Sequence, residues 1–292
     1  MTLSYLIGVD GGGTGTRARL CDTRGQVLAL GEAGPSSLSH GVAGAWQQIV
    51  LAVTRAFAAA NLPVPEWQHC ALAAGLAGVN APEQAAEFKA SNPGFATLVA
   101  DTDSFTALVG SHGGEPGLVL IAGTGSVAEV WRPDGSRRIA GGWGFPIGDE
   151  GGGAWLGFEA VKLAQQTIDG RATPGPLSEA VCAATGTDAD TMLSWCARAN
   201  QTAYASLAPL VFDTADTDAQ SAALLDGAVL ALDALVHALD PEGTLPVVCS
   251  GSVARRLQSR LPTVLRKRCR EPRGDAADGA LHLLRLKLAE AP

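Results

Sequence analysis

Short apolar stretches separated by tight turns open the chain. Residues 4–10, 15–21 and 26–31 have the length and apolar content of strands, and turn-forming residues bound them. Residues 118–131 and 136–139 repeat this pattern roughly a hundred residues later, again with a glycine-rich turn after the first strand. The chain therefore contains two β-meanders of the same design.

Segments with helical spacing follow the first meander. Residues 42–60 predict an amphipathic helix, and strands at 70–76 and 95–100 are followed by helices at 82–90 and 104–110. Strands that alternate with helices predict a mixed α/β sheet. The apolar residues of the first helix recur every three or four positions: Val42, Trp46, Ile49, Val53 and Phe57.

The second meander is followed by a similar order of elements with additional helices. We expect a helix at 154–167, a run of helices over 176–239, a strand at 245–250, a helix starting at Val253 and a last helix at 276–290. The two halves of the chain thus share the order meander, helix, strand, helix.

The length of 292 residues suits two domains, each able to bury a core. A Gly/Pro-rich segment at 113–117 separates a first lobe, 1–112, from a second lobe, 113–292. The interpretation leaves open whether the last helix packs back on the first lobe.

Composition narrows the classes of function. The net charge of −8 argues against general nucleic-acid binding, which needs a basic face. The one basic stretch, 255–273, is either a solvated face or a positive rim near a bound nucleotide or partner. The six cysteines lack metal spacing and indicate a reducing compartment. With neither a signal-peptide pattern nor an apolar run of about 18 residues, we expect a cytoplasmic protein without membrane contact.

A glycine-rich turn joins the first two strands of each meander. Such a turn lets main-chain N–H groups converge on an anion, since no side chain stands in the way. Two of them could hold one polyphosphate from both sides, which makes a two-lobed nucleotide-using enzyme the leading hypothesis. The alternative is a pair of plain glycine-rich hairpins. The predicted phosphate-binding residues are Gly11, Gly12, Gly13 and Thr14 in the first turn and Gly123, Thr124 and Gly125, with Ser126, in the second.

Other nucleotide folds fit less well. Residues 123–128 match the pattern G-x-G-x-x-A, but a short strand and a Pro-Asp-Gly turn follow in place of the helix that a Rossmann fold requires. A P-loop is excluded because the sequence contains no Gly-Lys dipeptide.

Six segments, taken together, resemble the superfamily of actin-like ATPases, sugar kinases and Hsp70. Within it the chain is similar to glucosamine kinases and N-acetylglucosamine kinases, grouped with the BadF/BadG/BcrA/BcrD-type ATPases. The resemblance implies an α/β fold of two ribonuclease-H-like lobes, ATP and Mg²⁺ in the inter-lobe cleft, and often a homodimer. The matching segments are 8–14, 101–103, 121–126, 141–151, 249–253 and 275–280.

The resemblance assigns roles on the nucleotide side. Asp10 ends the first strand, where a carboxylate can hold Mg²⁺ beside the phosphates, although a turn-forming Asp would look the same. Gly251 and Ser252 resemble the turn that contacts adenosine. Asp103 is the candidate general base, because the Thr-Asp pair of the family aligns with it. The alternative for Asp103 is a purely structural role as a helix N-cap, and Asp101 is a competing candidate for the base.

Residues on the sugar side are assigned in the same way. Asp149 resembles the ligand of sugar hydroxyls, and Gly142, Trp143 and Gly144 resemble the lining of the sugar site, alongside Ser126 and the base Asp103. Trp143 could equally be core packing. Relatives carry an Asn in the loop where this chain has Ser37 and Ser39, so Ser39 is the predicted sugar contact there. Asn80 could take the place of the Asn that this loop lacks. Because of this difference, the choice of hexose stays open.

The resulting prediction is ATP-dependent phosphorylation of an amino sugar, most simply glucosamine to glucosamine 6-phosphate. The alternatives are an N-acetylglucosamine kinase or a catalytically inactive sugar-binding regulator. An ATPase that drives electron transfer, as in the BadF-type activators, is disfavoured, because those proteins need cysteines that bridge an iron–sulfur cluster and the sequence shows no suitable pair.

Overall fold

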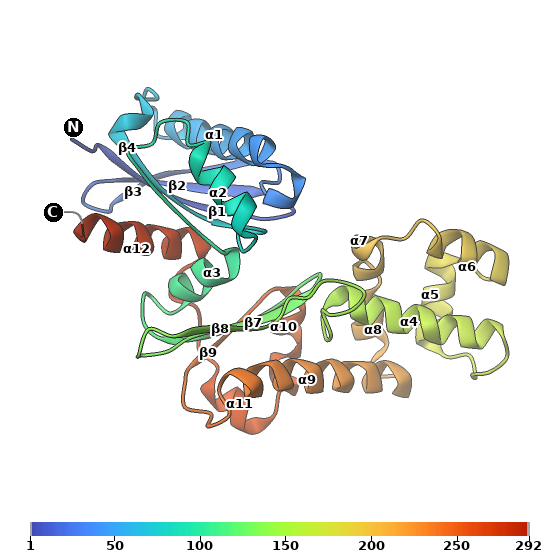
Figure 1. Ribbon diagram of the computed structural model, residues 1–292. Helices are drawn as coiled ribbons and strands as arrows, with labels where there is room; N and C mark the ends of the chain where they lie inside the picture. The colour runs from blue at the N-terminus through green and yellow to red at the C-terminus, as the bar shows by residue number, and fades with distance from the viewer. Residues whose placement is uncertain (1, 291–292) are drawn as a thin grey trace. The chain divides into compact units, whose positions relative to one another are not determined.

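The computed structural model describes residues 2–290, which form two compact units (Figure 1). The first unit comprises the chain up to Gly117 and again from Glu271, and the second spans Leu118–Arg270. The sequence placed a boundary at 112/113 and left open whether the last helix returns to the first lobe. The chain returns to the first unit because the last helix, α12 (Ala276–Ala289), packs its apolar face on strands there.

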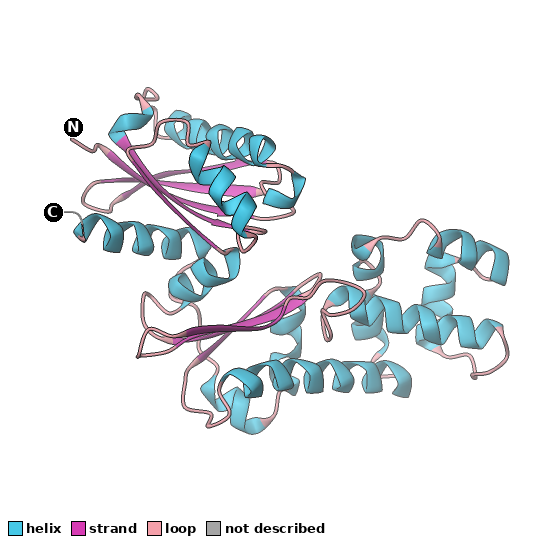
Figure 2. Ribbon diagram, in the orientation of Figure 1, coloured by secondary structure: helices cyan, strands magenta, loops and turns pink. Residues whose placement is uncertain are grey.

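A five-stranded sheet in the order β3-β2-β1-β4-β5 forms the centre of the first unit (Figure 2). The first three strands are antiparallel, whereas β4 and β5 run parallel to β1. Helix α1 (Val42–Ala59) packs on β2 and β3, and α12 packs on β1, β4 and helix α3. The other elements are β1 Tyr5–Gly11, β2 Thr16–Asp22, β3 Val27–Ala33, β4 Cys70–Leu76, α2 Pro82–Ala90, β5 Thr97–Asp101 and α3 Asp103–Ser111.

The register of the parallel strands brings two predicted site residues to one edge of this sheet. Asp10 of β1 lies beside Gly75 of β4, which lies beside Asp101 of β5. Asp103 follows two residues later, at the start of α3. A Cβ at Gly75 would lie 1.9 Å from Thr106 Oγ1, so only glycine allows α3 this close to the sheet.

The second unit has a four-stranded sheet in the order β8-β7-β6-β9. A fifth strand is reduced to a single parallel bridge between Val247 and Cys269, extended by a 2.8 Å hydrogen bond from the Arg270 N–H to the Val247 carbonyl. The strands are β6 Gly117–Ala122, β7 Ser126–Trp131, β8 Arg137–Gly141 and β9 Val247–Ser250.

Eight α-helices of the described residues accompany this sheet, and five of them form the run expected over 176–239. Helix α11 was not expected, because it is short, basic and buries only Leu265. The helices are α4 Gly153–Ile168, α5 Pro176–Thr185, α6 Ala189–Cys196, α7 Gln201–Ala205, α8 Ala208–Thr214, α9 Ala219–Leu239, α10 Ser252–Leu257 and α11 Thr263–Arg268.

Helix α9 has the length and mean hydropathy, 21 residues and 1.7, that a membrane span would need. It is the one helix of residues 2–290 that passes this test. We did not expect it from the sequence, because Asp226 and Asp233 interrupt the apolar run. Leu225, Leu232 and Val236 face the core of the unit, where α9 packs on β7, β8, α4 and α8. A core helix meets the same criterion, so this composition is weak evidence for a membrane.

Candidate active site

The first glycine turn is held at its base and open at its tip. The Gly12 N–H donates to the Gly15 carbonyl at 3.0 Å, and the Ser36 N–H donates to the Gly12 carbonyl at 3.1 Å. A Cβ at Gly11 would lie 2.2 Å from Ser36 Oγ, whereas a Cβ at Gly12 or Gly13 would meet nothing within 4 Å. The turn therefore has room for a ligand against its main chain.

A polar pocket of about 420 Å³ lies beside this turn. Its walls come from the ends of β1 and β2 and from β3, and Thr14 at the tip of the turn is exposed. The lining residues are Asp10, Gly12, Thr14, Gly15, Thr16, Arg17, Glu32 and Ala33.

Asp10 pairs with Arg17 across β1 and β2 at 3.0 Å. Burial raises the pKa of Asp10, the carboxylates of Asp275 and Asp103 raise it further, and Arg17 opposes them. A half-buried carboxylate with acidic neighbours favours a nearby cation. No cluster of three or more potential ligands is found among the described residues. This donor set suits Mg²⁺, which commonly takes one or two carboxylates together with substrate phosphates.

Asp103 is the first residue of α3, and the N-cap is its neighbour Thr102, whose hydroxyl accepts from the Phe105 N–H at 3.1 Å. The alternative that Asp103 is the N-cap is therefore wrong. Its Oδ1 accepts from the Ser104 N–H at 2.9 Å, and burial raises its pKa. The competing Asp101 accepts from the Thr102 N–H at 2.8 Å.

The loop containing Ser39 lies at the same edge of the first sheet. The Leu38 N–H donates to the Ala77 carbonyl at 2.9 Å, and the Ala77 N–H donates to the Gly11 carbonyl at 3.0 Å. Ser39 is exposed, and its hydroxyl is 2.8 Å from that of buried Ser37. The first unit thus gathers the first turn, Asp103 and the serine loop, and Asn80 is exposed in the neighbouring turn.

The second glycine turn leads into helix α4. The Gly123 N–H donates to the Gly125 carbonyl at 3.0 Å. The Gly153 and Ala154 N–H groups donate to the carbonyls of Gly123 and Thr124, at 2.7 and 2.8 Å. The start of α4 is therefore bonded to the turn, with the Thr124 side chain exposed.

Asp149 supports the underside of this turn. Its side chain is 5% exposed, and its oxygens accept from the Ser126 N–H at 3.3 Å and from Gln201 Nε2 at 2.8 Å. A Cβ at Gly125 would lie 2.4 Å from Asp149 Oδ2, so this position requires glycine. The Ser126 hydroxyl donates to the Glu150 carbonyl at 2.7 Å. The assigned role of Asp149 as a sugar ligand stays a prediction.

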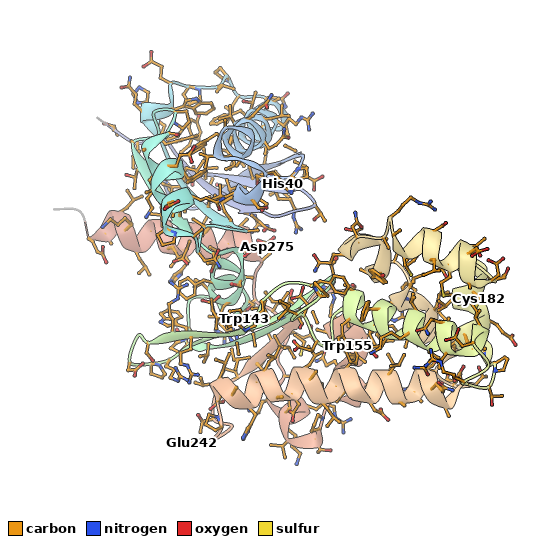
Figure 3. All side chains as sticks on the ribbon, turned by 45° about the vertical axis from the view of Figure 1, so that its right-hand side comes forward. His40, Trp143, Trp155, Cys182, Glu242 and Asp275 are labelled. Atoms are coloured by element: carbon orange, nitrogen blue, oxygen red, sulfur yellow. The ribbon has the colours of Figure 1, made fainter. Side chains whose placement is uncertain are left out.

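Trp143 is 83% exposed, so the core-packing alternative is wrong. Figure 3 labels this residue on the loop that follows β8. Ile147 on the same loop is 87% exposed. Gly142 and Gly144 flank Trp143 with φ of +70° and +84°, conformations that favour glycine. The loop therefore presents two large apolar side chains to solvent next to Asp149.

Gly251, with φ of +87°, is the N-cap of α10, and a Cβ there would lie 2.2 Å from the Ala122 carbonyl oxygen. Ser252 and the second turn line one pocket of about 180 Å³. The sequence reasoning missed the other side of this pocket, where the Arg256 guanidinium lies 4.0 Å from the centroid of Phe212 and pairs with Asp213 at 3.1 Å. The missed lining residues are Gly153, Ala205, Ala208, Pro209, Phe212 and Val253, whereas Arg256 belongs to the basic stretch 255–273.

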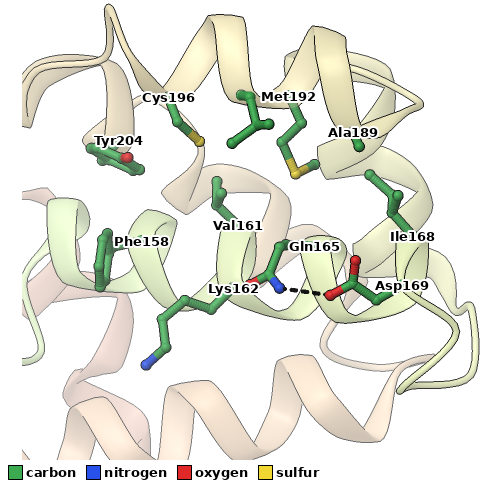
Figure 4. A pocket seen from close by; sticks show the side chains of 11 residues that line it. Phe158, Val161, Lys162, Gln165, Ile168, Asp169, Ala189, Met192, Cys196 and Tyr204 are labelled. Carbon is green, nitrogen blue, oxygen red and sulfur yellow. Dashed lines mark hydrogen bonds between the residues drawn. The ribbon is translucent and has the colours of Figure 1, made fainter.

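An apolar cavity of about 430 Å³ lies away from the predicted site residues, between α4 and α6 (Figure 4). Its polar lining groups already have partners, since Lys162 pairs with Glu159 at 2.8 Å and Gln165 donates to Asp169 at 3.0 Å. Phe158 and Tyr204 separate it from Phe145, a member of the glycine-rich loop.

The chain belongs to the BadF/BadG/BcrA/BcrD ATPase family, which it matches over residues 7–281. It is 30% identical to "Glucosamine kinase GspK" of Vibrio cholerae, over 96% of this chain and 95% of that protein. It is 46% identical, with a TM-score of 0.92, to the crystal structure of a Chromobacterium violaceum protein provisionally named an N-acetylglucosamine kinase, covering 97% and 99% of the two chains. A ROK family glucokinase of Streptomyces griseus, solved with glucose and AMPPNP, shares the fold at 14% identity and a TM-score of 0.54, covering 97% of this chain and 98% of that one. These relations confirm the expected family and the mixed α/β fold.

Proposed function

We propose that this protein is an ATP-dependent amino-sugar kinase that converts glucosamine to glucosamine 6-phosphate. The full-length similarity to a glucosamine kinase supports the choice of sugar. N-acetylglucosamine is the second candidate, because the relative with 46% identity bears that provisional name.

The observation that carries the proposal is the shared position of Asp10 and Asp103 at one edge of the first sheet. Burial raises the pKa of both carboxylates, and the charge of Asp103 raises the pKa of Asp10 further. Negative charge at this position therefore favours the binding of a cation or a proton. Asp103 accepts the proton of the attacking sugar hydroxyl, and its raised pKa strengthens it as a proton acceptor. The Ser104 N–H fixes the orientation of the carboxylate.

Main-chain N–H groups of the glycine turns bind the phosphates of ATP, and the pocket between Ser252 and Phe212 receives its nucleoside. When bound, Mg²⁺ neutralises charge that develops on the transferred phosphoryl group. Asp10 is the residue that would hold this ion, directly or through water.

The predicted sugar contacts are assigned within each described unit separately. Ser39 and Asp103 belong to the first unit, and Asp149 belongs to the second, with the loop around exposed Trp143. Asp149 can accept sugar hydroxyls because a carboxylate has room for more than the two hydrogen bonds already present.

A coupled assay of ADP release tests the proposal over glucosamine, N-acetylglucosamine and glucose with Mg-ATP. We expect the highest kcat/KM for glucosamine. A higher value for N-acetylglucosamine would favour the second candidate. No ADP release with any of the sugars would favour an inactive sugar-binding regulator.

A further inference from the structure

Two cysteines of the second unit lie side by side where the sheet lacks its fifth strand. Cys249 belongs to β9 and is 8% exposed, whereas Cys269 follows α11 directly and is half-buried. Their Sγ atoms are 3.8 Å apart. The bridge from Val247 to Cys269 and the hydrogen bond from Arg270 to Val247 hold the two segments together.

The surroundings make the two thiols unequal. A hydrogen bond from Cys249 and the nearby guanidinium groups of Arg268 and Arg270 lower the pKa of Cys269 to about 7, against an opposing effect of burial. The same contact with Cys269, together with burial, raises the pKa of Cys249. The thiolate is the reactive form of cysteine, so the more accessible Cys269 is also the better nucleophile.

We propose that Cys249 and Cys269 are an oxidation site at which a hydroperoxide forms a reversible disulfide. The Cys269 thiolate attacks the terminal oxygen of the hydroperoxide and breaks the O–O bond, giving a sulfenic acid and an alkoxide, which is hydroxide when the oxidant is hydrogen peroxide. The Cys249 thiol then attacks this sulfur, the S–S bond forms and water leaves. Two thiols are oxidised and one peroxide is reduced, and a small dithiol reverses the change by exchange.

The disulfide would act on the nucleotide pocket, a consequence that depends on the proposed function. The S–S bond is about 2.0 Å long, so the two sulfurs must approach each other substantially. Cys249 lies two residues before Gly251, whose main chain already packs tightly against the Ala122 carbonyl. Strand β9 therefore has little freedom to shift without moving Ser252 in the pocket. We expect a severalfold rise in the KM for ATP.

The test uses the purified full chain, reduced and then treated with hydrogen peroxide. Maleimide labelling and intact mass should count four free thiols after oxidation, against six before it. Peptide mapping should identify the Cys249–Cys269 linkage, and dithiothreitol should restore both the thiols and the KM for ATP.

Three variants separate the possible results. Cys269→Ser should give no linkage, and Cys249→Ser should stop at a sulfenic acid that dimedone traps. Cys182→Ser, at a half-buried cysteine of α5, is the matched control and should oxidise like the wild type.

Six free thiols in the wild type after peroxide treatment, or a loss of thiols in Cys269→Ser equal to that of the wild type, would overturn the oxidation site. A linkage without a change in KM would overturn the coupling to the pocket. If the linkage forms in a protein without kinase activity, the proposed function fails and the oxidation site stands.

Discussion

Gln201 Nε2 donates a 2.8 Å hydrogen bond to Asp149 Oδ2, which ties helix α7 to the loop beneath the second glycine turn. Helix α7 therefore helps to hold the loop that supports the second glycine turn. Gln201→Leu should leave a buried carboxylate short of a donor, and we expect a loss of about 1–3 kcal/mol in the free energy of unfolding. Urea denaturation measures this loss, with Gln47→Leu on the exposed face of α1 as control. Equal stability of the two variants would mean that this bond contributes nothing.

The first glycine turn offers a matched pair of substitutions. Gly11→Ala places a Cβ 2.2 Å from Ser36 Oγ and should lower the melting temperature, whereas Gly13→Ala meets nothing within 4 Å and should melt like the wild type. If the amides of this turn bind phosphate, Gly13→Ala should nevertheless raise the KM for ATP. Thermal denaturation and steady-state kinetics distinguish the two effects. An unchanged KM would place the phosphates elsewhere.

Phe212 forms a wall of the proposed nucleoside pocket and stacks with Arg256. Phe212→Ala should raise the KM for ATP about tenfold, which corresponds to about 1.4 kcal/mol of lost binding. The KM for the sugar should change little. Trp143→Ala is the complementary variant, since it should raise the KM for the sugar and leave that for ATP unaffected. If Phe212→Ala impaired both substrates equally, the wall would be a general structural element.

The activity should depend on pH through Asp103. The carboxylate must be ionised to accept a proton, and burial raises its pKa above the usual 3.8. The acid limb of the profile of kcat/KM should therefore lie above 3.8, with activity falling as the pH decreases through the raised pKa. Circular dichroism over the same range should show that the protein stays folded. A limb at or below 3.8 would exclude Asp103 as the group that titrates.

Much of the fold follows from local patterns. Strand β4 and helix α2 begin and end where the sequence predicted, because a continuous apolar run defines the first and a proline starts the second. Helix α11 escaped prediction because Thr263–Arg268 carries three basic residues and buries one side chain.

The candidate site was predictable where a residue follows a strand or a glycine turn, as at Gly123 and Ser252, and not where a distant helix contributes. Gly123 and Phe212 line one pocket although 89 residues separate them, and nothing local indicates how α8 packs. Arg256 was part of a basic stretch whose role could not be read from charge alone. The contact between Cys249 and Cys269 likewise depends on the bridge that replaces the fifth strand.

Asp103→Asn tests the central claim most directly. The substitution keeps the shape of the side chain and an acceptor for the Ser104 N–H but removes the proton acceptor, while Asp101→Asn provides a neighbouring control. The measurement is the rate at which glucosamine 6-phosphate forms from glucosamine and Mg-ATP, followed by phosphorus NMR. We predict that Asp103→Asn lowers kcat by about 10²–10⁴-fold while glucosamine still binds in calorimetry. Turnover by Asp103→Asn at the wild-type rate would contradict the account.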